Sequence, residues 1–327
     1  MERRKLGNTG LELTVIGFGA WAIGGGNWRF GWGPQDDREA VDAIRRALDL
    51  GVNWVDTAAV YGLGHSEELV ARALSGRRDQ VLIATKCSLI WNDRGEISSS
   101  LARESVRREC EASLRRLQTD HVDLYQIHWP NDEPRIEEGW EELGRLIDEG
   151  KVRYGGVSNF NVNQMKRAQA VRPIASLQPP YSMIRREVEG ASLAYCAAHG
   201  IGVVAYSPMQ SGLLTGSFDR ARLADGDWRL RDPEFLEPAL GATLELVEQL
   251  RPIAAGHAKS VAELAIAWVL RRPEVTSAIV GARRPSQIEQ TVGAAGWVLS
   301  AEELAVIDRL LEQRARRIPE RATRFRK

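Results

Sequence analysis

Four ionisable residues at or near the ends of short apolar runs are the strongest candidates for chemistry. Asp56, Lys86 and His128 each end such a run, and Tyr61 follows Asp56 by five residues. A tyrosine with its ordinary pKa of about 10 is too weak an acid at neutral pH. A neighbouring Lys86 ammonium would lower that pKa, and Asp56 would hold the buried lysine. His128 would donate a hydrogen bond to a substrate oxygen. The set predicts proton donation by Tyr61 coupled to hydride transfer.

Each of these residues also has an ordinary structural explanation. Asp56 could cap a loop, Lys86 could be a surface charge at a strand end, and His128 could be a polar residue without a special role. Their joint placement at the ends of consecutive runs favours catalysis. The sequence has no Gly-x-Ser-x-Gly, His-Glu-x-x-His, Walker or Cys-x-x-Cys motif. No metal is expected, because no ligand spacing surrounds the other histidines, which are His65, His121, His199 and His257.

A barrel of eight β/α units would bring the four residues to one face. Short apolar runs alternate with stretches of helical period, which is typical of helices packed around a parallel sheet. The eight runs are 15–16, 54–56, 81–86, 122–128, 153–158, 176–178, 202–206 and 277–280. The carboxyl ends of the strands in such a barrel open on the face where active sites are built. We therefore expect a (β/α)8 TIM barrel.

Local signals predict several further elements. Ser260 and Glu263 have the spacing of a helix capping box, and a helix is expected over 136–148. Residues 5–13 predict an N-terminal β-hairpin that could close one end of the barrel. The charged segment 218–238 is long enough to be a mobile loop that acts as a lid.

Composition narrows the possible partners. The 327 residues are expected to form one barrel domain, 1–327. Because 44 basic residues balance 44 acidic ones, neither nucleic acid nor an anionic membrane is an expected partner. The sequence lacks a signal peptide and any apolar run of about 18 residues, the length that suggests a membrane helix. Three cysteines without metal-binding spacing indicate free thiols in a reducing compartment. We expect a cytoplasmic monomer or small homo-oligomer that acts on a small molecule.

Several segments resemble the aldo-keto reductase superfamily, and the resemblance extends over nearly the whole chain. They are 51–62, 66–67, 123–130, 155–160, 178–181 and 206–208. Residues 21–25 and 178–181 resemble most the bacterial branch that contains inositol-operon and general-stress reductases. The resemblance implies a barrel without a Rossmann domain and NADP-dependent reduction of an aldehyde or ketone to an alcohol, with Tyr61 as the general acid. The alternative is a redox-sensing regulatory protein, related to channel β subunits, that binds the cofactor and turns over slowly.

The resemblance also implies which residues contact the cofactor. Ser158, Asn159 and Gln178 would hold the nicotinamide carboxamide, and Tyr206 would stack on the ring. Gly212 would allow the backbone to approach the pyrophosphate. The full set comprises Gly19, Ala20, Trp21, Asp56, Ser158, Asn159, Gln178, Tyr206, Ser207, Pro208, Met209, Ser211, Gly212, Gly281, Arg283, Gln287 and Gln290.

The choice between NADPH and NADH depends on the segment after the eighth run. Many relatives place a lysine and an arginine where this sequence has Gly281 and Gln287. Arg283 could bind the 2′-phosphate in a forked geometry instead, so we favour NADPH. Residues 17–22 formally fit a dinucleotide fingerprint, but residues 23–26 are too rich in glycine to open a helix.

Tryptophans dominate the expected substrate pocket. Trp28 and Trp32 could form its walls or could only anchor a glycine-rich loop. An aromatic pocket suits sugars, aromatic aldehydes or aliphatic carbonyls, and the sequence does not select among them. The expected pocket residues are Trp21, Tyr61, Trp91, His128 and Trp129.

Overall fold

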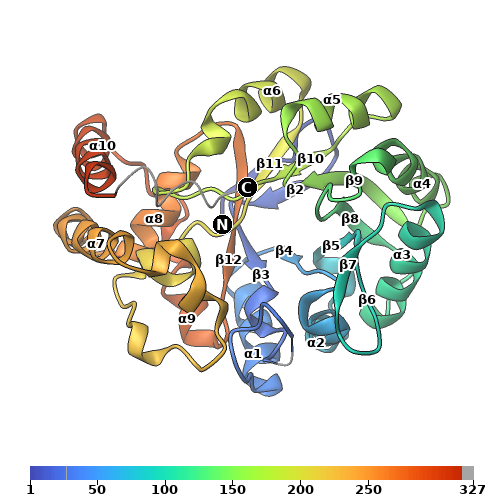
Figure 1. Ribbon diagram of the computed structural model, residues 1–327, viewed down its shortest axis with the longest axis horizontal. Coiled ribbons are helices and arrows are strands. Elements are labelled where there is room, and N and C mark those ends of the chain that lie inside the picture. Colours follow the sequence, from blue (N-terminus) through green and yellow to red (C-terminus); the bar gives the residue numbers. More distant parts are fainter. Residues whose placement is uncertain (27, 319–327) are drawn as a thin grey trace.

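The computed structural model describes residues 1–26 and 28–318 and contains a closed barrel of eight parallel strands (Figure 1). Around the barrel the order is β10-β11-β12-β3-β4-β5-β8-β9. The strands are β3 (Ile16–Gly19), β4 (Trp54–Asp56), β5 (Leu82–Cys87), β8 (Val122–Ile127), β9 (Val152–Ser158), β10 (Ser176–Gln178), β11 (Gly202–Ala205) and β12 (Val275–Gly281). Each strand overlaps one of the eight predicted runs, which confirms the (β/α)8 fold. The largest difference is in β3, which continues three residues past the predicted end.

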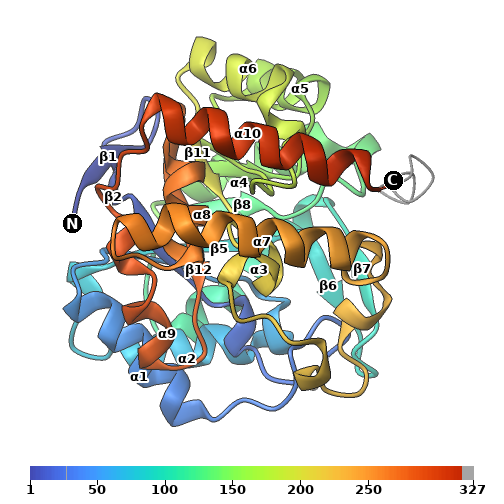
Figure 2. The same cartoon turned by 90° about the vertical axis from the view of Figure 1, so that its left-hand side faces the viewer.

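Helices surround the barrel, as Figure 1 shows. They are α1 (Asp37–Asp49), α2 (His65–Leu74), α3 (Arg103–Leu117), α4 (Ile136–Asp148), α5 (Val162–Val171), α6 (Ala191–His199), α8 (Val261–Leu270) and α9 (Pro285–Glu289). Two longer helices, α7 (Ala239–Gly256) and α10 (Ala301–Arg316), pack against each other (Figure 2). The structure confirms the helix predicted over 136–148 and the capping box of Ser260 and Glu263, which begins α8.

Within residues 1–26 and 28–318, no single helix combines the length and the apolar composition that a membrane span requires. Only α7 and α8 taken together pass that test, and the chain bends by 85° between them.

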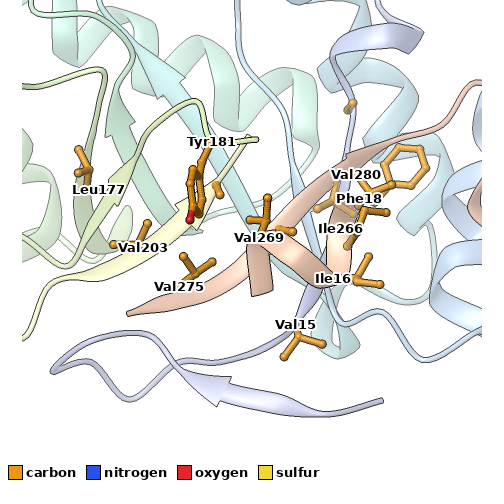
Figure 3. Close-up of a cluster of buried hydrophobic side chains, with 14 of the residues drawn as sticks. Val15, Ile16, Phe18, Leu177, Tyr181, Val203, Ile266, Val269, Val275 and Val280 are labelled. Carbon is orange, nitrogen blue, oxygen red and sulfur yellow. The ribbon is translucent and has the colours of Figure 1, made fainter. Parts of the chain in front are cut away.

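Apolar side chains on the outer face of the sheet pack against the helices, and a separate apolar cluster fills the inside of the barrel. Figure 3 shows part of this core, where Ile16, Val203 and Val275 from three strands lie near Ile266 and Val269 of α8. A parallel sheet covered by helices is buried on both faces, so its strands are apolar along most of their length. Polar residues on these strands are therefore exceptions. Asp56, Lys86 and Gln178 lie at or next to the carboxyl ends, while Asp123 and Ser277 lie nearer the amino ends.

The predicted N-terminal hairpin is present and closes one end of the barrel. Its strands β1 (Arg3–Lys5) and β2 (Glu12–Thr14) pair antiparallel. Leu6, Leu11 and Leu13 are buried in one cluster with inward-facing barrel residues. Figure 2 shows β1 and β2 at one end of the molecule and a second hairpin, β6 (Leu89–Trp91) and β7 (Ile97–Ser99), at the other.

The glycines of the segment 17–22 have a packing role. A Cβ atom at Gly17 would overlap the indole of Trp54, and one at Gly19 would lie 2.7 Å from Ile279. The Trp54 indole is itself fixed by hydrogen bonds to Thr14 O at 3.2 Å and Ser277 Oγ at 3.1 Å. Both glycines therefore leave room for large side chains inside the barrel. This agrees with the rejection of a dinucleotide fingerprint.

Candidate active site

The four predicted catalytic side chains meet at the carboxyl end of neighbouring strands. Asp56 ends β4, Lys86 is the second-last residue of β5, and His128 follows β8 directly. Lys86 Nζ donates hydrogen bonds to Asp56 Oδ1 at 2.6 Å and to Thr57 O at 2.8 Å. It also lies 3.2 Å from the Tyr61 hydroxyl oxygen. The ring of His128 meets that of Tyr61 edge-on, with centroids 5.6 Å apart.

A tight turn sets the position of Tyr61. This residue begins the short 3-10 helix η2 (Tyr61–Gly64). Gly62 has a φ of 63°, and a Cβ atom there would overlap the carbonyl group of Gly24. Only glycine adopts this conformation without strain and leaves room for the close approach. The glycine after Tyr61 is therefore a requirement of the turn.

Burial fixes the protonation states of the site. Burial and the nearby Asp56 carboxylate raise the pKa of Tyr61 well above its usual value. Burial lowers the pKa of Lys86, and the ion pair with Asp56 opposes this shift. Burial, with the Lys86 charge, holds the pKa of His128 well below its usual value. The site at neutral pH therefore contains a neutral phenol, a neutral imidazole and an ion pair. The shift of the Tyr61 pKa is therefore opposite to the lowering by Lys86 that the sequence predicted, because burial and the Asp56 charge dominate.

A cavity of about 660 Å³ extends from these side chains over the mouth of the barrel. Lys86 lies beneath it and is only 1% exposed. The predicted residues that line the cavity are Gly19, Trp21, Asp56, Tyr61, His128, Trp129, Ser158, Asn159, Gln178, Tyr206, Ser207, Pro208, Met209, Ser211, Gly212, Gly281, Arg283, Gln287 and Gln290. The structure thus brings together one continuous site from both halves of the chain.

Two predicted residues do not line the cavity. Ala20 is buried, and its backbone N–H donates to Asp56 O at 2.8 Å. Trp91 lies on β6, because the chain leaves β5 through Ser88 at a φ of 81° and enters the hairpin. The Trp91 ring instead packs near the Arg116 guanidinium of α3, 5.8 Å from its centroid. The structure corrects the predicted placement of both residues.

Two segments cover the cavity, and we name them together the roof: residues 28–36 after β3 and residues 218–238 before α7. Trp28 and Trp32 both line the cavity, which answers the question left open by the sequence. Trp228 stacks on Trp21 with centroids 5.8 Å apart and planes inclined by 20°. The Arg229 guanidinium lies 4.2 Å from the centroid of the Trp32 ring.

Sequence reasoning missed the role of Trp228 and Arg229. The only signal was the length and charge of their segment, which carries three short 3-10 helices rather than a regular helix. These are η7 (Arg220–Arg222), η8 (Trp228–Arg231) and η9 (Pro233–Phe235). Such a path shows no hydrophobic period, so no pattern in the segment indicates which of its side chains face the cavity.

Arg283 does not lie free at the end of the cavity. Its guanidinium donates hydrogen bonds to Gln35 Oε1 at 2.7 Å, to Trp32 O at 3.1 Å and to Pro34 O. Its backbone N–H donates to Gln287 Oε1 at 2.7 Å. Arg283 therefore connects the end of β12 to the roof. A phosphate bound by Arg283 would have to compete with these roof contacts.

Among the described residues, no group of three or more His, Cys, Asp or Glu side chains is arranged to hold a metal ion. The three cysteines, Cys87, Cys110 and Cys196, are free and buried. The polar chemistry of the cavity thus rests on the residues at the strand ends.

A single eight-stranded barrel with this site at its mouth defines a class of carbonyl-reducing enzymes that have no separate nucleotide-binding domain. Residues 15–312 match the aldo/keto reductase family, and the chain belongs to that family. Its members are NAD(P)H-dependent oxidoreductases, so the chain is an enzyme of this kind.

Similar proteins span nearly the full chain. The aldo-keto reductase YhdN of Bacillus subtilis is 41% identical, over 95% of this chain and 94% of its own. The NADH-specific methylglyoxal reductase of Escherichia coli is 32% identical, over 95% and 99%. A probable voltage-gated potassium channel subunit beta of Arabidopsis thaliana is 33% identical, over 97% and 98%. The structure of a glycerol dehydrogenase from Gluconobacter oxydans superposes with a TM-score of 0.87 at 37% identity, covering 97% of this chain and 96% of that one.

Proposed function

We propose that this enzyme uses NADPH to reduce an aldehyde or ketone to an alcohol, with Tyr61 as the general acid. One observation carries the proposal. The buried Lys86 ammonium contacts the Asp56 carboxylate at 2.6 Å and the Tyr61 hydroxyl at 3.2 Å at the floor of a large cavity. When bound, the cofactor supplies the hydride that reaches the carbonyl carbon.

The protein's own groups manage the proton and the charge. The Tyr61 hydroxyl gives its proton to the carbonyl oxygen as negative charge develops there. The neutral His128 ring donates a hydrogen bond to the same oxygen. The phenolate that remains lies 3.2 Å from the Lys86 ammonium, which stabilises it. Asp56 keeps that ammonium in place. Because its pKa is raised, Tyr61 is a weak acid in the empty site, and it relies on the Lys86 ammonium and on the charge that develops on the carbonyl oxygen to give up its proton.

Two side-chain amides support the nicotinamide assignment. Gln178 Nε2 is committed to Asp56 Oδ2 at 2.8 Å, so the Gln178 carbonyl oxygen is left as an acceptor. Asn159 Nδ2 lies at the cavity and donates to His128 O and to Ser158 Oγ, each at 3.0 Å, and the N–H on Ser158 Oγ would be shared with the carboxamide. A primary carboxamide has one carbonyl acceptor and an amide donor. The pair of amides is complementary to that group.

Arginines at the far end of the cavity support the choice of NADPH. Arg222, Arg229, Arg283 and Arg284 all line the cavity, and two of them have acidic partners, Arg222 with Asp219 and Arg229 with Asp227. The Arg283 guanidinium is satisfied only by neutral oxygens, and a phosphate is a stronger partner for a guanidinium than a neutral oxygen is. We propose that the 2′-phosphate replaces one of the roof carbonyls as a partner of Arg283.

Dissociation constants for NADPH and NADH, measured by fluorescence titration, test the cofactor assignment. Arg283→Gln should weaken NADPH binding and leave NADH binding nearly unchanged, since NADH lacks the 2′-phosphate. A wild-type protein that prefers NADH, as the name of the E. coli relative states for that enzyme, would remove Arg283 from this role.

Tyr61→Phe tests the mechanism. The ring remains, but the proton donor is lost, so turnover of a carbonyl panel should fall by about 10²- to 10⁴-fold while cofactor affinity changes little. Tyr195→Phe is a matched control, because Tyr195 lies on α6 away from the cavity. Unchanged turnover in Tyr61→Phe contradicts the mechanism.

The similarity to plant channel β subunits favours a second candidate function. In that case the chain is a redox-sensing, cofactor-binding regulatory protein that turns over slowly. Single- and multiple-turnover assays separate the two functions. Oxidation of only one equivalent of NADPH per chain, across aldehydes and ketones, favours the regulatory role. Repeated turnover with any of them supports the reductase.

We further propose a cytoplasmic enzyme that is a monomer or a small homo-oligomer and acts on a small-molecule carbonyl compound, without nucleic acid or membrane partners. The three buried free cysteines support a reducing compartment. The aromatic cavity walls suit an organic substrate but do not single out one compound. A substrate panel with NADPH consumption as the readout, and light scattering for the oligomeric state, test these points.

A further inference from the structure

We infer that the Tyr206 hydroxyl is a positioning group, which holds the Asn159 amide so that its nitrogen faces the carboxamide of the cofactor, with which the N–H on Ser158 Oγ can be shared. The inference rests on the proposed function and assigns a new role at the same site. Tyr206 follows β11 directly, and Asn159 follows β9 directly. Both line the cavity.

The contacts around Asn159 select one orientation of its amide. The Tyr206 hydroxyl donates to Asn159 Oδ1 at 2.9 Å. On the other side, Asn159 Nδ2 donates to the backbone oxygen of His128 and to Ser158 Oγ, each at 3.0 Å. In the reverse orientation Asn159 Oδ1 would face the His128 carbonyl, and two acceptors would repel each other. The Tyr206 hydroxyl and the His128 carbonyl therefore favour the same orientation.

The backbone of Asn159 is also fixed. Its φ is 62°, in the left-handed region that asparagine adopts more readily than most residues. Its N–H donates to Gln178 O at 3.1 Å across the barrel edge. The side chain therefore starts from a rigid base, and the contact with Tyr206 limits the remaining rotation.

Tyr206 stays a donor over the working pH range. Burial raises the pKa of its phenol to about 12, against the opposing charges of Arg185 and Lys86. The nearby Tyr61 phenol raises the pKa further. The hydroxyl is protonated near neutral pH, so Asn159 Oδ1 keeps its partner there.

Asp56 performs the equivalent task for Gln178. Its Oδ2 accepts from Gln178 Nε2 at 2.8 Å, while its Oδ1 holds Lys86. Gln178 is thus held through its amide nitrogen by Asp56, and Asn159 is held through its amide oxygen by Tyr206. Because Asp56 also belongs to the catalytic set, its replacement cannot separate the two roles. Tyr206 can be tested alone.

Tyr206→Phe keeps the aromatic ring for stacking and removes only the hydroxyl. The probes are NADPH and two of its analogues. The thionicotinamide analogue replaces the carboxamide oxygen by sulfur, a weak acceptor, and so reports on the donor of Asn159. The 3-acetylpyridine analogue keeps the carbonyl but lacks the amide nitrogen, and so reports on the acceptor of Gln178.

In Tyr206→Phe the dissociation constants of NADPH and of the acetylpyridine analogue should rise about fivefold, the effect of one lost hydrogen bond. The thionicotinamide analogue should be nearly unaffected, so the preference for oxygen over sulfur shrinks. Tyr195→Phe should leave all three constants unchanged. Tyr206→Leu, which also removes stacking, should weaken all three ligands alike.

Asn159→Asp gives a second test should Tyr206→Phe fold poorly. It keeps an acceptor for the Tyr206 hydroxyl but replaces the donor by oxygen, so the preference for NADPH over the thionicotinamide analogue should be lost. An equal weakening of all three ligands in Tyr206→Phe overturns the inference and leaves the proposed function standing. A wild-type protein that binds none of them overturns the proposed function itself.

Discussion

The two ends of the barrel interior have opposite chemistry, although they are built on the same strands. Successive inward-facing residues of a strand are two positions apart, and here one such step separates an apolar residue from a polar one. The step occurs from Trp54 to Asp56 on β4, from Ala84 to Lys86 on β5 and from Leu124 to Gln126 on β8. The apolar layer meets the leucines of the N-terminal hairpin, and the polar layer forms the floor of the cavity.

This difference separates stability from catalysis. The apolar layer stabilises the fold by burying surface, which depends on volume and shape rather than on particular atoms. The polar layer contains an ion pair, whose burial costs desolvation energy and needs every partner present. We therefore expect substitutions at the hairpin end to change the free energy of unfolding, and substitutions at the cavity end to change the rate of reduction.

The largest effect is expected from Lys86→Met. The substitution removes the charge that stabilises the Tyr61 phenolate and leaves the Asp56 carboxylate without its cation. The value of kcat/KM for carbonyl reduction should fall by about 10²- to 10⁴-fold, as measured by steady-state NADPH oxidation.

A double variant, Lys86→Met with Asp56→Asn, serves as the control for folding. It removes both members of the buried pair, so it should recover most of the stability lost in Lys86→Met. It should remain inactive. Activity close to wild type in Lys86→Met would show that the lysine is not part of the chemistry.

Leu6→Ala tests the opposite end. Leu6 is fully buried in the cluster that closes the barrel. Its truncation should lower the free energy of unfolding by about 2–5 kcal/mol, as measured by urea denaturation, while kcat/KM stays unchanged. Val298→Ala, at a residue that is 85% exposed, should have little effect. A fall in kcat/KM without a loss of stability would mean that the two ends are coupled.

A smaller effect on kcat/KM is expected from a change of pH. The Tyr61 pKa lies well above its ordinary value and the His128 pKa well below. Neither group should therefore change protonation between about pH 6 and 8, since their ordinary values are about 10 and 6.5. The pH profile of kcat/KM for reduction should be level across this range. A decline toward acid with a midpoint near the ordinary histidine value would contradict the neutral, buried state of His128.

Much of the polar layer could be predicted from the sequence because it depends on strands. The apolar runs located all eight barrel strands, and the parallel arrangement placed Asp56, Lys86 and His128 at one face. The Lys86 contacts with Asp56 and Tyr61 then follow from neighbouring strands. Periodicity and strand order are sufficient for these residues.

The remaining features depend on loop paths, which carry no such period. Trp91 was expected at the cavity, but the hairpin after β5 directs it toward α3. Arg283 was predicted only as a phosphate ligand, and its contacts with the roof, about 250 positions earlier in the chain, were not foreseen. The contact of Tyr206 with Asn159 joins two loop residues in the same way. Such pairs form only once the barrel has closed.

The smallest effect on the rate of reduction is expected in the roof, where aromatic and charged side chains are in contact. The Arg229 guanidinium donates to Asp227 at 2.7 Å and to Ser211 O at 3.1 Å, and it lies over Trp32. Arg229→Gln should remove a cation–π contact of about 0.5–2 kcal/mol together with the ion pair to the buried Asp227, and so loosen the joint between the two roof segments. Stopped-flow fluorescence should then show a severalfold faster release of NADPH, with little change in the chemical step.

Arg231→Gln, at an exposed position on the same 3-10 helix, is the matched control. A segment that retains the cofactor must release it faster when the contact between the two roof segments is weakened. Equal release rates in wild type and Arg229→Gln would therefore mean that the roof covers the cavity without limiting the release of NADPH.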